Sequence, residues 1–69
     1  MEKTFDTAFG EVTLRGAMID TNGTDLVEGV EIKIDGNLAG EVLGINFYQV
    51  EDMTIDEVED FVKENCAYF

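Results

Sequence analysis

The stretch TIDEVEDFVKEN, residues 54–65, decides the fold, because it predicts a helix at both of its ends and along its length. Thr54 is followed three residues later by Glu57, the pairing of a capping box that marks a helix N-terminus. Acids in the first turn and Lys63 near the last turn suit the helix dipole. Apolar side chains share one face at helical spacing, with Cys66 one turn further on, and these are Ile55, Val58, Phe61 and Val62.

The residues before this helix alternate in polarity and therefore predict strands. The clearest strand is VEIKI, residues 30–34, in which valine and isoleucine face inward and the charged residues face outward. Earlier strands are expected over residues 3–9 and 12–19, joined by a turn at Gly10-Glu11. Gly16 lies inside the second of them and predicts a bulge or a close approach of another part of the chain.

A hairpin is predicted directly after VEIKI, because Asp35-Gly36 is a strong turn signal between apolar runs. A three-residue loop that includes Asn37 would set Ile34 opposite Leu38 and Val30 opposite Val42. That register pairs apolar residues with apolar residues. The returning strand is expected to end near Gly44, before a further apolar run.

Together these elements predict an α+β fold, with a small antiparallel sheet of three to five strands and one C-terminal amphipathic helix, in the order β-β-β-β-α. The helix is needed as a cover, since a bare hairpin is marginal in water. A length of 69 residues allows one domain. We therefore expect residues 1–69 to form a single acidic α+β domain.

The segment IDTNGTDLVEGVE, residues 19–31, has two interpretations. A calcium loop needs oxygen ligands and a glycine at its sixth position, but the sixth residue from Asp20 is Asp25. Asn22-Gly23 instead predicts a tight hairpin turn, because both residues tolerate positive φ. We expect the hairpin and no metal site. The oxygen-bearing side chains that a calcium loop would use are Asp20, Asn22, Thr24, Glu28 and Glu31.

Charge is the most extreme property of the chain. Sixteen acids and four bases give a formal net charge of -12. Such a field repels nucleic-acid phosphates and anionic lipids, so we expect no direct binding to nucleic acid or membrane. It attracts basic protein surfaces. With a lone cysteine and no apolar N-terminal run, the chain is expected to be cytoplasmic.

The acids are densest around the predicted helix, where residues 51–64 contain seven acids and one lysine. Helix neighbours three or four residues apart lie about 5–6 Å from each other at Cβ. That spacing is similar to the phosphate repeat along one nucleic-acid strand. The alternative interpretation is a solvated helix face. The candidate partner-binding residues are Asp56, Glu59, Asp60, Glu51, Asp52 and Glu31.

The sequence offers few of the side chains and pairings on which enzyme catalysis commonly depends. The chain has no histidine, Cys66 has no partner cysteine, and nothing fixes two carboxylates across a pocket. We expect no enzyme activity and no cofactor, and we interpret Cys66 as a buried structural thiol. The aromatic pairs Phe47-Tyr48 and Tyr68-Phe69 are expected to close the ends of the core, with anchoring of a partner as the alternative.

These observations lead to two hypotheses of function. In the first, the chain is a non-enzymatic protein-binding module whose acidic surface docks on a basic site of a partner. Its sharpest form is an inhibitor that imitates DNA phosphates to block a nucleic-acid-binding enzyme, such as a phage-encoded counter-defence protein. In the second, it is a small structural or regulatory domain, paired with a second copy through strand edges, whose acidity only keeps it soluble.

Overall fold

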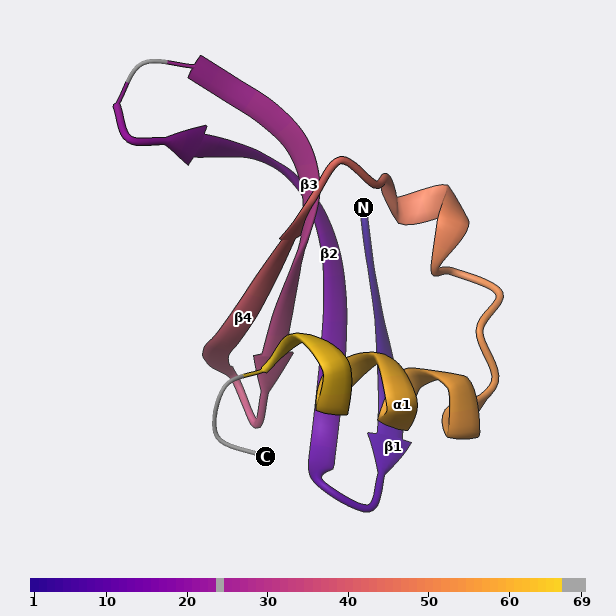
Figure 1. The fold of residues 1–69 in the computed structure, drawn as a ribbon. Coiled ribbons are helices and arrows are strands. Elements are labelled where there is room, and N and C mark those ends of the chain that lie inside the picture. Colours follow the sequence, from indigo (N-terminus) through magenta and orange to yellow (C-terminus); the bar gives the residue numbers. More distant parts are fainter. Residues whose placement is uncertain (24, 67–69) are drawn as a thin grey trace.

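The computed structural model describes residues 1–23 and 25–66 and confirms the predicted fold class, an antiparallel sheet followed by one helix. The four strands form a meander in which each strand pairs with the next along the chain (Figure 1). The elements are β1 (Glu2–Thr7), β2 (Gly10–Thr21), β3 (Asp25–Ile34), β4 (Asn37–Leu43), the short 3-10 helix η1 (Phe47–Gln49) and α1 (Ile55–Asn65).

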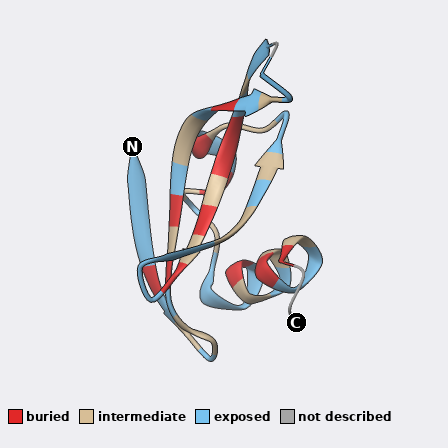
Figure 2. Ribbon diagram, turned by 90° about the vertical axis from the view of Figure 1, so that its left-hand side faces the viewer, coloured by how far each residue is buried: buried red, intermediate tan, exposed pale blue. Residues whose placement is uncertain are grey.

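The hydrophobic core lies between α1 and the face of the sheet that α1 crosses, which we call the inner face (Figure 2). The alternation predicted for VEIKI is confirmed, since Val30, Ile32 and Ile34 are buried while the residues between them are not. Val12 and Leu14 of β2 fill the same layer. The opposite side of the sheet, the outer face, has no helix over it in the described part of the chain.

The turn between β1 and β2 lies at Ala8-Phe9, so the predicted turn at Gly10-Glu11 is wrong. The Thr7 hydroxyl explains the difference. It accepts a hydrogen bond from the Phe9 backbone N–H at 3.1 Å and donates one to the Gly10 carbonyl at 2.9 Å. Phe9 therefore belongs to the turn, where its half-buried ring packs against the core.

Gly16 marks a close approach and not a bulge, since β2 pairs with β3 in an unbroken register through this residue. A Cβ atom at Gly16 would lie only 3.0 Å from the Phe47 Cβ atom. Real Cβ contacts are rarely so short, so the missing side chain is what lets η1 pack on the sheet.

The β3–β4 hairpin uses a two-residue turn, with positive φ at Asp35 and Gly36. Ile34 therefore faces Asn37, and the predicted Ile34–Leu38 pair is wrong. The extra residue enters one step later, as a bulge at Ala39 between two paired positions. The bulge restores the predicted pairing of Val30 with Val42.

The β2–β3 hairpin is confirmed, with positive φ at Asn22 and Gly23. Its pairing ends at Thr21 with Asp25, so the connection is one residue longer than a two-residue turn. The far half of this hairpin, residues 17–21 and 25–29, projects beyond the other elements, and we call it the arm (Figure 1).

The helix begins as predicted, because Thr54 and Glu57 form both hydrogen bonds of the capping box. Val58, Val62 and Cys66 are buried. Ile55 was expected on the buried face but is 41% exposed. Figure 1 shows the first turn of α1 beyond β1, at the edge of the sheet, where no strand is available to cover it.

The apolar run after Gly44 forms η1 and not a fifth strand. Asn46 and Gln49 make a second capping box, in which each side chain bonds to the backbone of the other residue. The spacing is that of a helix start, so the sequence contained a signal for this element. Phe47 is buried by η1, whereas Tyr48 is left exposed.

Candidate functional site

Three exposed carboxylates follow one another along α1, at spacings of four residues, and we call them the helix row: Asp56, Asp60 and Glu64. Residues four apart lie on the same side of a helix, about 5–6 Å from each other at Cβ. Two of the three belong to the predicted site, and the third, Glu64, is exposed at the end of this row.

The four bases of the chain are all engaged or placed away from the helix row. Arg15 makes the ion pairs found in the described part of the chain, with Glu31 at 2.9 Å and with Glu2 at 4.0 Å. Lys3 donates a hydrogen bond to the Glu51 backbone carbonyl at 2.8 Å. Lys33 lies on the outer face of the sheet, opposite Thr13, and not beside the residues of the helix row. The negative charge of the row is therefore not neutralised by an ion pair within the described residues.

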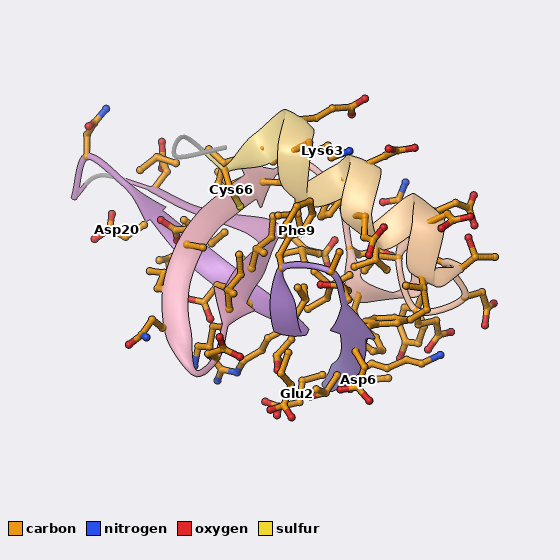
Figure 3. The ribbon with its side chains drawn as sticks, turned by 90° about the horizontal axis from the view of Figure 1, so that it is seen from below. Glu2, Asp6, Phe9, Asp20, Lys63 and Cys66 are labelled. Atoms are coloured by element: carbon orange, nitrogen blue, oxygen red, sulfur yellow. The ribbon has the colours of Figure 1, made fainter. Side chains whose placement is uncertain are left out.

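Lys63 is the only base on α1, and its ammonium lies over an aromatic ring. The Nζ atom is 5.9 Å from the centroid of the Phe9 ring, a cation–π distance. Figure 3 shows Lys63 and Phe9 together between the helix and the β1–β2 turn, while Glu2 and Asp6 lie on the far side of the sheet. Lys63 thus serves the contact between α1 and that turn.

Glu59 also has a structural contact, because its Oε2 atom accepts a hydrogen bond of 2.7 Å from the Ala8 backbone N–H. A turn leaves such N–H groups without a strand partner, and a carboxylate is a strong acceptor for them. Glu59 is half-buried, unlike its neighbour Asp60. Its role in the fold depends on a contact 51 residues away, which helical spacing alone does not show.

Glu31 lies apart from the other predicted residues, on the outer face of the sheet. Its side chain is 20% exposed and its carboxylate is paired with Arg15. Glu51 and Asp52 precede α1, and Asp52 is exposed whereas Glu51 is half-buried. The structure therefore brings together Asp56 and Asp60, with Glu59 beside them, and does not bring Glu31 to the same surface.

The outer face mixes acids with bases along the strands. The pairing places Glu2 next to Arg15, Arg15 next to Glu31, and Glu31 next to Glu41. A lysine, Lys33, faces Thr13 on the same side of the sheet. This face is acidic in total, but Glu2 and Glu31 lie beside the positive charge of Arg15.

The segment that resembled a calcium loop has no calcium-loop geometry. Its flanks are strands, and the Asp20 Oδ1 atom accepts a hydrogen bond from the Gly23 backbone N–H at 2.8 Å. Glu28 and Glu31 are three residues apart on one strand and face opposite sides of the sheet. No three acidic or cysteine side chains within residues 1–23 and 25–66 gather closely enough to hold a metal ion. Thr24 lies outside the described residues.

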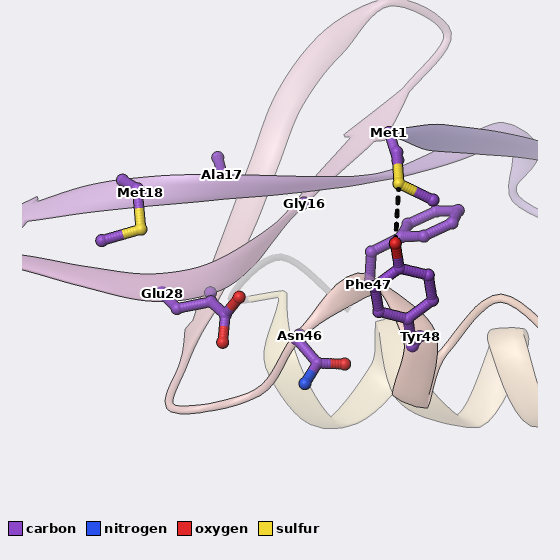
Figure 4. A pocket seen from close by; sticks show the side chains of 9 residues that line it. Met1, Gly16, Ala17, Met18, Glu28, Asn46, Phe47 and Tyr48 are labelled. Atoms are coloured by element: carbon purple, nitrogen blue, oxygen red, sulfur yellow. Dashed lines mark hydrogen bonds between the residues drawn. The ribbon is translucent and has the colours of Figure 1, made fainter.

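A depression of about 370 Å³ lies where the arm, the N-terminus and η1 meet. Its walls come from elements that are far apart in the sequence, and Gly16 lets them meet by admitting Phe47. The Tyr48 hydroxyl donates a hydrogen bond of 3.2 Å to the Met1 sulfur, which joins two sides of the wall (Figure 4). The side chains that line it include Met1, Met18, Glu28, Asn46, Phe47 and Tyr48.

Cys66 is buried at the end of α1, as predicted, and burial raises the pKa of its thiol through desolvation. It packs against β4 at Gly40, where a Cβ atom would lie 3.1 Å from the sulfur and 2.8 Å from the Asn65 carbonyl oxygen. The thiol is thus part of the contact between helix and sheet. The terminal pair Tyr68-Phe69 lies outside the described residues.

Comparisons with known proteins found no relative: no family model matches the chain, and no curated protein or solved structure matches it. Within the described residues, α1 and η1 are too short or too polar to cross a membrane.

Proposed function

We propose that the chain is a non-enzymatic protein-binding module that docks the helix row on a basic surface of a partner protein. The observation that carries this proposal is the row itself: three exposed carboxylates on one side of α1, with the bases of the chain engaged or placed elsewhere. An uncompensated row projects its field into solvent, whereas a neutralised pair does not.

The rigidity of α1 supports the same proposal. The capping box holds its first turn, and the buried side chains Val58 and Val62 fix its orientation on the sheet. The Glu59–Ala8 hydrogen bond and the Lys63–Phe9 contact hold its outer flank. Carboxylates on such a helix keep their spacing when a partner approaches, so little conformational entropy is lost on binding.

The spacing of the row favours one kind of partner. Carboxylates whose Cβ atoms lie about 5–6 Å apart resemble successive phosphates of a nucleic-acid strand. A groove lined with arginine and lysine for a phosphate backbone would therefore accept them. In its sharpest form, the proposal is an inhibitor that occupies the nucleic-acid site of an enzyme.

Quantitative capture with charge-matched variants tests the proposal. One variant carries Asp56→Lys, Asp60→Lys and Glu64→Lys, and reverses the helix row. Its control has the same net charge but reverses three exposed acids of the outer face: Asp6→Lys, Glu11→Lys and Glu41→Lys. We expect basic, nucleic-acid-binding proteins to be captured by the wild type and the control at low salt, and at least about tenfold less by the row variant.

Competition with duplex DNA then separates mimicry from simple charge attraction. A captured partner should release the protein when DNA is added, because both occupy one groove. Equal loss of capture in both variants would show that net charge alone is responsible and would overturn the proposal. Retention of a partner in the presence of saturating DNA would remove the inhibitor form of it.

The alternative, a homodimeric structural domain, is opposed by the charge of the molecule. Two copies that each carry a formal net charge of -12 repel one another at low salt. Sedimentation of the wild type at low and high salt decides this point. A dimer that is tight at both salt concentrations would favour the structural alternative.

A further inference from the structure

The depression beside η1 combines apolar walls with one carboxylate. Met1, Met18 and Tyr48 are 59–66% exposed, and all three lie around one hollow. They come from the N-terminus, β2 and η1, and the Met1–Tyr48 hydrogen bond holds two of them together. The apolar surface is therefore arranged by the fold and is not a scatter of single residues.

Glu28 supplies the charge at this site. It lies directly opposite Met18 in the arm, and its side chain is exposed at the wall of the depression (Figure 4). Its backbone carbonyl accepts a hydrogen bond from the Gly44 N–H, which fixes the strand at this point. The ion pairs of the described residues leave the Glu28 carboxylate unpaired.

We infer that this depression receives an arginine side chain of the basic partner. Methionine side chains contact the aliphatic stem of an arginine, because both are apolar and flexible. The guanidinium group then reaches the Glu28 carboxylate and the Tyr48 ring, which attract it by charge and by the ring quadrupole. Arginine fits this combination better than lysine, since its planar group both stacks and forms directed hydrogen bonds.

The depression is open beside the arm. The inner side of the arm is not covered by α1, as Figure 1 shows, so the depression is accessible from solvent. The overall negative field draws a cationic side chain towards the depression. The inference rests on the proposed function for the identity of the partner, but the arginine site itself can be measured without one.

A short peptide provides that measurement. Acetyl-Gly-Arg-Gly-amide is titrated into the 15N-labelled protein at low salt, and amide chemical shifts are followed by NMR. We expect saturable shifts with a millimolar dissociation constant at the amides of Met18, Glu28 and Tyr48. The same peptide with citrulline in place of arginine keeps the shape but loses the charge, and it should give no saturable shifts.

Two single variants locate the binding. Glu28→Gln should weaken the arginine peptide about two- to fivefold, the range of one exposed charge contact. Glu41→Gln removes an exposed acid on the outer face and should leave the dissociation constant unchanged. Equal shifts with citrulline, equal weakening in both variants, or the absence of saturable shifts at the depression would each overturn the inference.

A third variant separates this inference from the proposed function. Asp56→Asn, Asp60→Asn and Glu64→Gln together neutralise the helix row and leave the depression intact. Saturable peptide shifts that persist in this variant support an arginine site independent of the row. If partner capture then proves indifferent to the row, the proposed function fails while the arginine site stands. If capture needs the row and the peptide does not bind, only the arginine site fails.

Discussion

The outer face of the sheet and the exposed side of α1 are both rich in acids, but they differ in what lies beside those acids. On the outer face, Arg15 sits between Glu2 and Glu31. On α1, Lys63 is turned to the Phe9 ring, and no ion pair among the described residues reaches Asp60 or Glu64. The number of acids therefore does not distinguish the two surfaces, whereas the positions of the few bases do.

The same comparison holds for stability. The ion pair on the outer face favours the fold, whereas like charges four residues apart on a helix disfavour it by about 0.2–0.5 kcal/mol per pair. The capping Glu57 and the turn-binding Glu59 serve the fold through hydrogen bonds, which the helix row does not make among the described residues. Asp56 lies in the first turn and suits the helix dipole, whereas Asp60 and Glu64 add repulsion without such a gain.

The largest expected difference between the two faces is in leucine truncation. Leu14 is fully buried on the inner face, whereas Leu38 is 56% exposed. Leu14→Ala should lower the free energy of unfolding by about 2–5 kcal/mol, because it removes buried area and leaves a cavity. Leu38→Ala should change it by less than about 0.5 kcal/mol. Urea unfolding measures both, and similar losses would contradict the assignment of the faces.

A substitution at Gly29 tests how the outer face packs at the base of the arm. A Cβ atom at Gly29 would lie 2.5 Å from the Val42 carbonyl oxygen and 2.6 Å from the Ile19 Cδ1 atom. Gly29→Ala should therefore cost about 1–3 kcal/mol of stability through overpacking. The double variant with Ile19→Ala should recover part of that loss, since one of the two clashes is removed. An unchanged unfolding midpoint in Gly29→Ala would show that the arm does not pack as described.

Two single neutralisations should have small effects of opposite sign on the two faces. Glu31→Gln breaks the pair with Arg15 and should lower stability by about 0.2–1 kcal/mol. Asp60→Asn removes repulsion along the helix row and should raise stability by about 0.2–0.5 kcal/mol. Thermal unfolding at low salt resolves the signs, and high salt should shrink both effects. A change in stability of the same sign in both variants would contradict the difference between the two faces.

Local signals predicted most of the fold. The capping box at Thr54 and the turn at Asn22-Gly23 each depend on a few neighbouring residues, and both are found. The bulge at Ala39 was missed because it lies outside the loop and leaves Val30 opposite Val42. The capping box that starts η1 at Asn46 was readable, but the apolar residues around it favoured the interpretation of a strand.

The candidate site was harder to predict, because its composition depends on contacts between distant segments. Helical spacing placed Asp56 and Asp60 correctly on one side of α1. It could not show that Glu59 binds the Ala8 backbone, or that Glu31 pairs with Arg15 across two strands. Sequence therefore identified where acids are dense, whereas the tertiary structure decided which of them are free.

Association kinetics test the central claim most directly. The association rate of a captured partner is measured by stopped flow over a range of salt for three proteins: the wild type, the row neutralised by Asp56→Asn, Asp60→Asn and Glu64→Gln, and the outer face neutralised by Asp6→Asn, Glu11→Gln and Glu41→Gln. We predict that only the row variant loses rate at low salt, by about tenfold or more, together with most of its salt dependence. Equal slowing of the two variants would contradict the claim, because net charge and not the helix row would then govern binding.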